Sequence, residues 1–173
     1  MSGSYVANFT GECCTLVLDK ELGIIVVPES FTCPNDHASA ARQYPGVRLE
    51  LNLKTEWFGH LRIAFQQGWR FKVSALKCED SRQTTSSAVE FEMRTGDGIF
   101  LGYAGILELC RQHRETLIPG MEYVAVGSEN EGSLIPSVRL MNGDEKPLVR
   151  GYYPESASWD PQITRFLLFE FLG

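Results

Sequence analysis

Apolar and polar residues alternate in several segments of this chain, as expected for strands with one buried and one solvated face. Residues 47–54 show the pattern most regularly, because Val47, Leu49 and Leu51 alternate with charged and amide side chains. Residues 71–76 and 89–94 repeat the alternation, and residues 121–126, 134–140 and 147–153 are predicted as further strands. The sequence therefore predicts a protein built mainly of strands.

A turn signal joins two of these strands into a hairpin. Asn142-Gly143 is typical of a two-residue hairpin turn, so residues 147–153 are expected to return along residues 134–140. Pro136 lies inside the first of these two segments and has no amide hydrogen to donate to a neighbouring strand. This proline predicts that residues 134–140 form an edge strand or contain a bulge.

The two ends of the chain have different patterns. Near the N-terminus, the polar residues 19–21 predict a hairpin between residues 14–18 and 23–27. Residues 163–172 are apolar on both faces of a strand, which is typical of a central strand covered on both sides. We therefore expect that removal of residues 163–172 unfolds the domain, and we expect no functional tail after them.

Helical signals are few. Pro34 at a first helical position predicts a helix over residues 34–43, which ends before Tyr44-Pro45-Gly46. A 3.6-residue apolar period predicts a second helix over residues 103–115, which Pro119-Gly120 follows. The strands come in runs rather than in alternation with helices. The predicted fold class is α+β, with a mostly antiparallel, strongly curved sheet or open barrel or sandwich and two short helices.

Size and composition agree with one domain over residues 1–173, because no linker, repeat or low-complexity tract divides the chain. The formal charge of −6 and the scattered basic residues argue against nucleic-acid binding. No apolar run is long enough to span a bilayer, and the first five residues do not resemble a signal peptide. The five cysteines lack disulfide-framework spacing. We expect a soluble, acidic, cytoplasmic protein that lies outside the membrane.

Cys33 is the candidate nucleophile. It precedes Pro34, so its thiol is expected at a helix N-terminus, where a thiolate is favoured. His60 begins a predicted strand and could serve as its general base. Together they define one functional alternative, a hydrolase or transferase that acts on an acyl or peptide-like substrate. No third orienting residue is evident, and the sequence signatures of known cysteine nucleophiles are absent.

A zinc site is a further possibility. Cys13, Cys14, Cys33 and His37 offer soft ligands, and His37 follows Cys33 by one helical turn. Adjacent residues on a strand point to opposite faces, however, so Cys13 and Cys14 are not expected to hold one ion together. We therefore predict no metal and no cofactor, and leave the question of metal binding by these four residues open.

Aromatic and acidic residues gather in two loops. Tyr152, Tyr153 and Trp159 lie in or beside a proline-bracketed loop, and Glu129 and Glu131 lie in another. Large amphipathic rings are common anchors of binding surfaces, although such rings also close the ends of β-cores. An acidic rim would favour a partner with a basic surface.

The leading hypothesis is a binding protein without catalytic activity, such as an adaptor, an enzyme inhibitor or an assembly subunit, with another protein as its partner. A second alternative to this hypothesis is a module that binds a small molecule within a curved sheet. The residues that would line the sheet are Leu49, Leu51, Phe71, Val73 and Phe91. The pattern of these residues is explained more simply as ordinary core.

Overall fold

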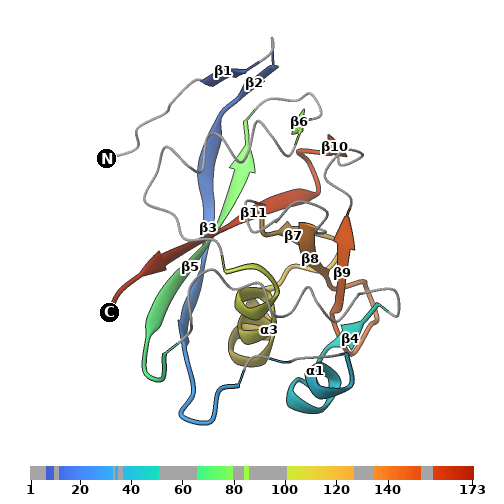
Figure 1. Ribbon diagram of the computed structural model, residues 1–173. Coiled ribbons are helices and arrows are strands. Elements are labelled where there is room, and N and C mark those ends of the chain that lie inside the picture. The colour runs from blue at the N-terminus through green and yellow to red at the C-terminus, as the bar shows by residue number, and fades with distance from the viewer. Residues whose placement is uncertain are drawn as a thin grey trace.

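The computed structural model describes residues 7–9, 12–32, 34, 37–50, 66–79, 84–85, 101–126, 135–152 and 158–173. Most of the described strands belong to one seven-stranded sheet, whose strand order is β3-β5-β11-β7-β8-β9-β4 (Figure 1). These strands are β3 (Leu16–Val26), β4 (Arg48–Leu49), β5 (Arg70–Cys78), β7 (Glu122–Val124), β8 (Ile135–Arg139), β9 (Leu148–Tyr152) and β11 (Thr164–Phe171). All neighbours in the sheet are antiparallel except β11 with β7 and β4 with β9.

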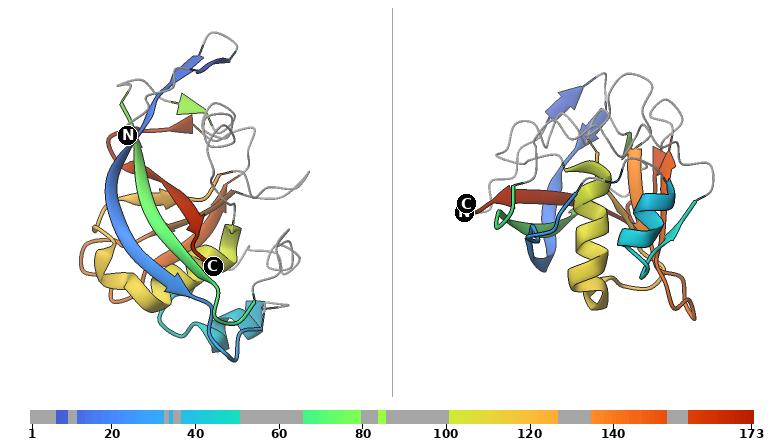
Figure 2. Two further views of the ribbon diagram at one scale, coloured as in Figure 1. Left: turned by 90° about the vertical axis from the view of Figure 1, so that its left-hand side faces the viewer. Right: turned by 60° about the horizontal axis from the view of Figure 1, so that its bottom comes forward.

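The remaining described elements are short. The strands β1 (Ala7–Phe9) and β2 (Glu12–Cys14) pair with each other, and so do β6 (Thr84–Thr85) and β10 (Ser158–Trp159). The helices are α1 (His37–Gln43), α3 (Gly102–His113) and the 3-10 turn η2 (Arg114–Thr116). The long strands β3 and β5 bend along their length, and the sheet does not close (Figure 2). The predicted α+β class with a curved, mostly antiparallel sheet and two short helices is confirmed.

The two faces of the sheet carry separate clusters of buried side chains. On one face, strand residues such as Val73, Tyr123 and Phe169 pack with Ile106 and Leu109 of α3 to form the main core. Helix α3 is buried along residues 102–110 and lies close against the sheet. A Cβ atom at Gly105 would lie only 2.8 Å from the ring of Phe169, so glycine is required for this close approach. The opposite face carries a smaller cluster around Val124, Trp159 and Phe166.

Strand β3 differs from its prediction. Instead of a hairpin around residues 19–21, the chain runs as one strand of 11 residues paired with β5. Irregularities between Leu18 and Lys20 and between Glu21 and Gly23 interrupt the register and absorb the extra residues. Gly23 has φ 121°, which side-chain-bearing residues rarely adopt. The polar residues that resemble a turn in the sequence therefore lie at bulges, and the predicted hairpin is wrong.

Strand β8 is not an edge strand, contrary to the prediction from Pro136, because it pairs with both β7 and β9. The carbonyl oxygen of Pro136 accepts a hydrogen bond of 3.0 Å from Ala125 N, just after the end of β7. Its ring nitrogen faces the same side, where the ladder with β7 stops. The sheet tolerates this proline because the hydrogen bond that it omits falls at the end of a short ladder.

Other predictions agree with the structure. Strand β11 is central, between β5 and β7, and residues 142–143 form the turn between β8 and β9. Helix α3 occurs nearly as predicted, whereas α1 begins at His37 rather than at Pro34. Strand β4 covers only residues 48–49 of the predicted strand 47–54. Residues 51–54 and the whole of strand 89–94 lie outside the described residues.

The outer edge of β3 is covered by side chains from α3. Gln112 accepts a hydrogen bond from Val26 N through Oε1 and donates one to Val26 O through Nε2, each of 2.9 Å. His113 Nε2 lies 2.7 Å from Ile24 O. The N–H and C=O groups of Val27 bond to Trp69 and Gly68, on the β5 side of β3. The N–H and C=O groups of Val26 therefore point to the outer side of β3, where the end of α3 bonds to them.

Candidate functional site

Charged side chains of three neighbouring strands meet on the face of the sheet opposite α3. Glu122 of β7 is directly across from Arg139 of β8, and Ser137 of β8 is directly across from Arg150 of β9. Thr164 of β11 is opposite Glu122 on the other side. Directly opposed residues share a face, and so do residues two apart on one strand. The register therefore gathers these five polar residues without any contribution from a loop.

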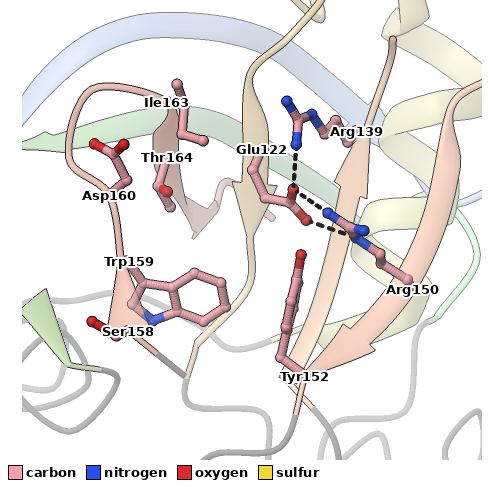
Figure 3. A pocket seen from close by; sticks show the side chains of 9 residues that line it. All are labelled: Glu122, Arg139, Arg150, Tyr152, Ser158, Trp159, Asp160, Ile163 and Thr164. Atoms are coloured by element: carbon pink, nitrogen blue, oxygen red, sulfur yellow. Dashed lines mark hydrogen bonds and ion pairs between the residues drawn. The ribbon is translucent and has the colours of Figure 1, made fainter. Parts of the chain in front are cut away.

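Glu122 is the centre of this group, and its exposed fraction is only 4%. Arg150 donates to it from Nε (3.2 Å, to Oε1) and from Nη2 (2.7 Å, to Oε2), and Ser137 Oγ donates to Oε1 over 2.8 Å. The second arginine is farther away, because Arg139 Nη1 lies 3.9 Å from Oε2 (Figure 3). A buried carboxylate is stabilised by such donors. Arg150 thus neutralises Glu122, and Arg139 makes only a long ion pair with it.

The charge of Arg139 is therefore poorly compensated. Both arginines lie within 4 Å of a single carboxylate, which leaves one positive charge in excess at this point. Arg139 Nε is buried and has no hydrogen-bond partner among the described residues. A buried donor without an acceptor is costly, so the guanidinium would gain from an additional oxygen ligand.

Aromatic rings form the wall beside these charges. Tyr152 and Trp159 contact edge to face, with ring centroids 5.1 Å apart, and Trp159 contacts Phe166 in the same way at 6.3 Å. The guanidinium carbon of Arg150 lies 5.0 Å from the centroid of the Tyr152 ring, in cation–π contact. Burial raises the pKa of Tyr152 to about 12, and the negative charge of Glu122 adds to this rise. Tyr152 is thus a neutral phenol at physiological pH.

A cavity of about 210 Å³ lies between the charges and the rings. Glu122 and the two arginines line one side of it, and Ile163 and Trp159 lie on the other side (Figure 3). Asp160 also lines the cavity but is exposed, and its Oδ1 accepts a hydrogen bond of 2.9 Å from Gln162 N. The complete lining among the described residues is Glu122, Arg139, Arg150, Tyr152, Ser158, Trp159, Asp160, Ile163 and Thr164. This arrangement suits a ligand with one charged end and one apolar part.

A second buried carboxylate, on the other face of the sheet, has a different environment. Glu108 of α3 accepts hydrogen bonds from Tyr44 Oη (2.7 Å), Gln112 Nε2 (2.7 Å) and the Nε and Nη2 atoms of Arg111 (2.9 and 2.8 Å). None of these residues lines the cavity described above. The Glu108 network links α3, the residue after α1 and, through Gln112, strand β3. Its role is to hold the fold together.

The structure describes only some of the residues that the sequence singles out. Tyr152 and Trp159 both line the cavity, and Trp159 is 4% exposed, so its ring forms part of a wall rather than a protruding anchor. Tyr153, Glu129 and Glu131 lie outside the described residues. Their suggested role in binding stays a prediction.

The residues of the catalytic and metal alternatives are not brought together by the described part of the chain. Cys33 and His60 both lie outside it. His37 Nε2 lies 3.3 Å from Glu50 O, and Cys13 and Cys14 are in β2. The described residues contain no group of three or more histidine, cysteine or acidic residues that could hold a metal ion.

The thiols of Cys78 and Cys110 do not suggest a reactive cysteine. Both residues are buried, and burial raises the pKa of the Cys110 thiol to about 12. Leu49, Phe71 and Val73, which would line a ligand site in the second alternative, belong to the main core. Leu51 and Phe91, the other two residues of that lining, are outside the described part of the chain.

Sequence reasoning missed Glu122, Arg139 and Arg150. The available signal was the presence of charged residues inside strands that are otherwise apolar.

None of the helices in the described residues is long and apolar enough to cross a membrane. Comparison of the chain with protein-family models, with curated proteins and with solved structures finds no match, so the geometry of the site carries the functional argument.

Proposed function

We propose that the protein acts by binding rather than by catalysis, and that the cavity above β7, β8 and β9 holds part of its partner. The observation that carries the proposal is the convergence of two arginines on one buried carboxylate beside an aromatic wall. Glu122 is engaged by donors from Arg150 and Ser137, so it is poorly available as a base. No cysteine or histidine is among the described lining residues.

The partner is a protein of the cytoplasm, and the formal charge of −6 favours a partner with a basic surface. The cavity is too small for more than a minor part of a protein, so it would receive a single side chain or chain end of the partner. The hydrolase or transferase alternative rests on Cys33 and His60, which both lie outside the described residues. The binding proposal is supported by the cavity and its charged and aromatic lining.

The test fills the cavity. Ile163 lines it and is 40% exposed, and Ile118 is equally exposed, at 41%, but does not line it. Ile163→Trp should abolish retention of the partner from a cell extract, whereas Ile118→Trp should retain it like the native protein. Retained species are identified by mass spectrometry, and unfolding curves verify the fold of both variants. Equal retention by all three proteins would show that the cavity is not the binding site.

A further inference from the structure

We propose that the cavity binds a carboxylate that has an apolar group attached to it, with Arg139 as the residue that receives the carboxylate. This inference rests on the proposed binding function and names the chemistry of the group that enters.

The side of the cavity lined by Glu122 and the two arginines favours an anion. Two arginines and one carboxylate leave one positive charge, and that charge resides on Arg139, whose contact with Glu122 is 3.9 Å long. Arg139 is the less constrained of the pair, because Arg150 is fixed by two hydrogen bonds to Glu122 and by the Tyr152 ring. A carboxylate matches the fork of a guanidinium with two parallel hydrogen bonds. A small rotation of Arg139 would offer it two donors, including the nitrogen that now lacks an acceptor.

The charge balance favours a monoanion over a phosphate. The described charged residues of the lining are Arg139 and Arg150 against Glu122 and Asp160, so the whole cavity is formally neutral. One added negative charge is accommodated by the local excess at Arg139. A second would be repelled by Glu122 and Asp160. We therefore expect a carboxylate to bind better than a phosphate monoester of similar shape.

The opposite side of the cavity supplies the apolar contact. Trp159 and Ile163 lie across from the arginines, and Tyr152 flanks them (Figure 3). A carboxylate bound at Arg139 would therefore direct its substituent toward these side chains. The last residue of a polypeptide with an apolar side chain has this combination of groups, and so does a small aryl or alkyl carboxylic acid.

The experiment measures binding of N-acetylphenylalanine to the native protein by calorimetry. N-acetylphenylalaninamide, in which an amide replaces the carboxylate, should bind about tenfold more weakly or worse. Phenethyl phosphate should also bind more weakly than the carboxylate. Phenylacetate, a small acid without a peptide group, distinguishes a polypeptide C-terminus from a free carboxylic acid as the source of the ligand. Tighter binding of N-acetylphenylalanine indicates a chain end, and tighter binding of phenylacetate indicates a free acid.

Variants locate the site. Arg139→Met should weaken the binding of N-acetylphenylalanine by about tenfold and leave the weak binding of N-acetylphenylalaninamide unchanged. Arg48→Met removes an arginine of β4 that pairs with Asp144 and does not line the cavity, and it should change the affinity by less than about twofold. Ile163→Trp should block the acid, which keeps the test valid if Arg139→Met does not fold.

The outcomes separate this inference from the proposed function. If the amide or the phosphate binds as tightly as the acid and Ile163→Trp blocks it, the cavity is a ligand site but the carboxylate inference is wrong. If none of the probes binds the native protein, the carboxylate inference is also wrong. The extract experiment with Ile163→Trp and Ile118→Trp then decides the proposed function independently.

Discussion

The protein buries two glutamates, and their surroundings differ in a way that separates folding from function. Glu108 is 1% exposed, and donors from Tyr44, Arg111 and Gln112 occupy its carboxylate. Glu122 is 4% exposed, but it borders a cavity and has one arginine that binds it closely and one that does not. Burial of a charge alone therefore does not identify a site. The useful signal is a charged group that remains unsatisfied next to open space.

The largest expected loss of stability comes from a change in the Glu108 network. Glu108→Gln replaces one carboxylate oxygen with an NH2 group, which must face either the Tyr44 hydroxyl or the donors of Arg111 and Gln112, and it should lower the free energy of unfolding by about 3 kcal/mol. Denaturant titration measures the change. Glu115→Gln, at an exposed carboxylate just after α3, is the control and should stay within about 0.5 kcal/mol of the native protein. A cost below about 1 kcal/mol for Glu108→Gln would contradict a structural role for this network.

The equivalent change at the cavity should cost less. Glu122→Gln should lower the free energy of unfolding by about 2 kcal/mol. The cost is smaller because Arg139 and Arg150, which lose their charged partner, are partly exposed and can be solvated by water. The same variant should bind N-acetylphenylalanine more tightly, since it removes the negative charge beside Arg139. Denaturant titration and calorimetry give the two values. Reduced affinity in a folded Glu122→Gln variant would show that Glu122 helps to receive the ligand.

Each carboxylate has a neighbouring tyrosine, which permits a matched comparison. Tyr44→Phe removes a hydrogen bond of 2.7 Å to a buried charge and should cost about 1.5 kcal/mol. Tyr152→Phe keeps the ring that contacts Trp159 and Arg150 and removes a hydroxyl that points toward Glu122 (Figure 3), and because this side chain is only half-buried it should cost less, about 0.5 kcal/mol at neutral pH. Thermal and denaturant unfolding measure both. Equal costs would remove the distinction between the two regions.

The smallest expected effect at neutral pH becomes visible in alkali. The pKa of Tyr152 rises from 10.0 to about 12 in the folded protein, mainly through burial, so the fold retains a proton that the unfolded chain releases. The contribution of Tyr152 is therefore complete below pH 10.0 and is lost as the pH rises toward about 12. Tyr152→Phe should lose stability less steeply over this window than the native protein. Identical slopes in unfolding titrations would contradict the burial of this phenol.

The fold was more predictable than the site. Alternation reveals β5 and the hairpin of β8 and β9, and the two-sided apolar pattern places β11 at the centre, because each depends on neighbours along the chain. Strand β3 was mistaken for a hairpin because bulges and turns use similar polar and glycine residues. The site depends on register between strands, which brings Glu122 beside Arg150 although 28 positions separate them. A single sequence does not specify that register.

The contact between Gln112 and β3 has a consequence for the behaviour of the protein in concentrated solution. The primary amide of Gln112 bonds to both main-chain groups of Val26, as a neighbouring strand would do. Ile24 and Val26 are exposed apolar residues. Without the Gln112 contact, β3 could therefore pair with the same strand of another molecule and extend the sheet. The Gln112 side chain thus blocks strand pairing at Val26, and a substitution that removes its amide would favour self-association through β3.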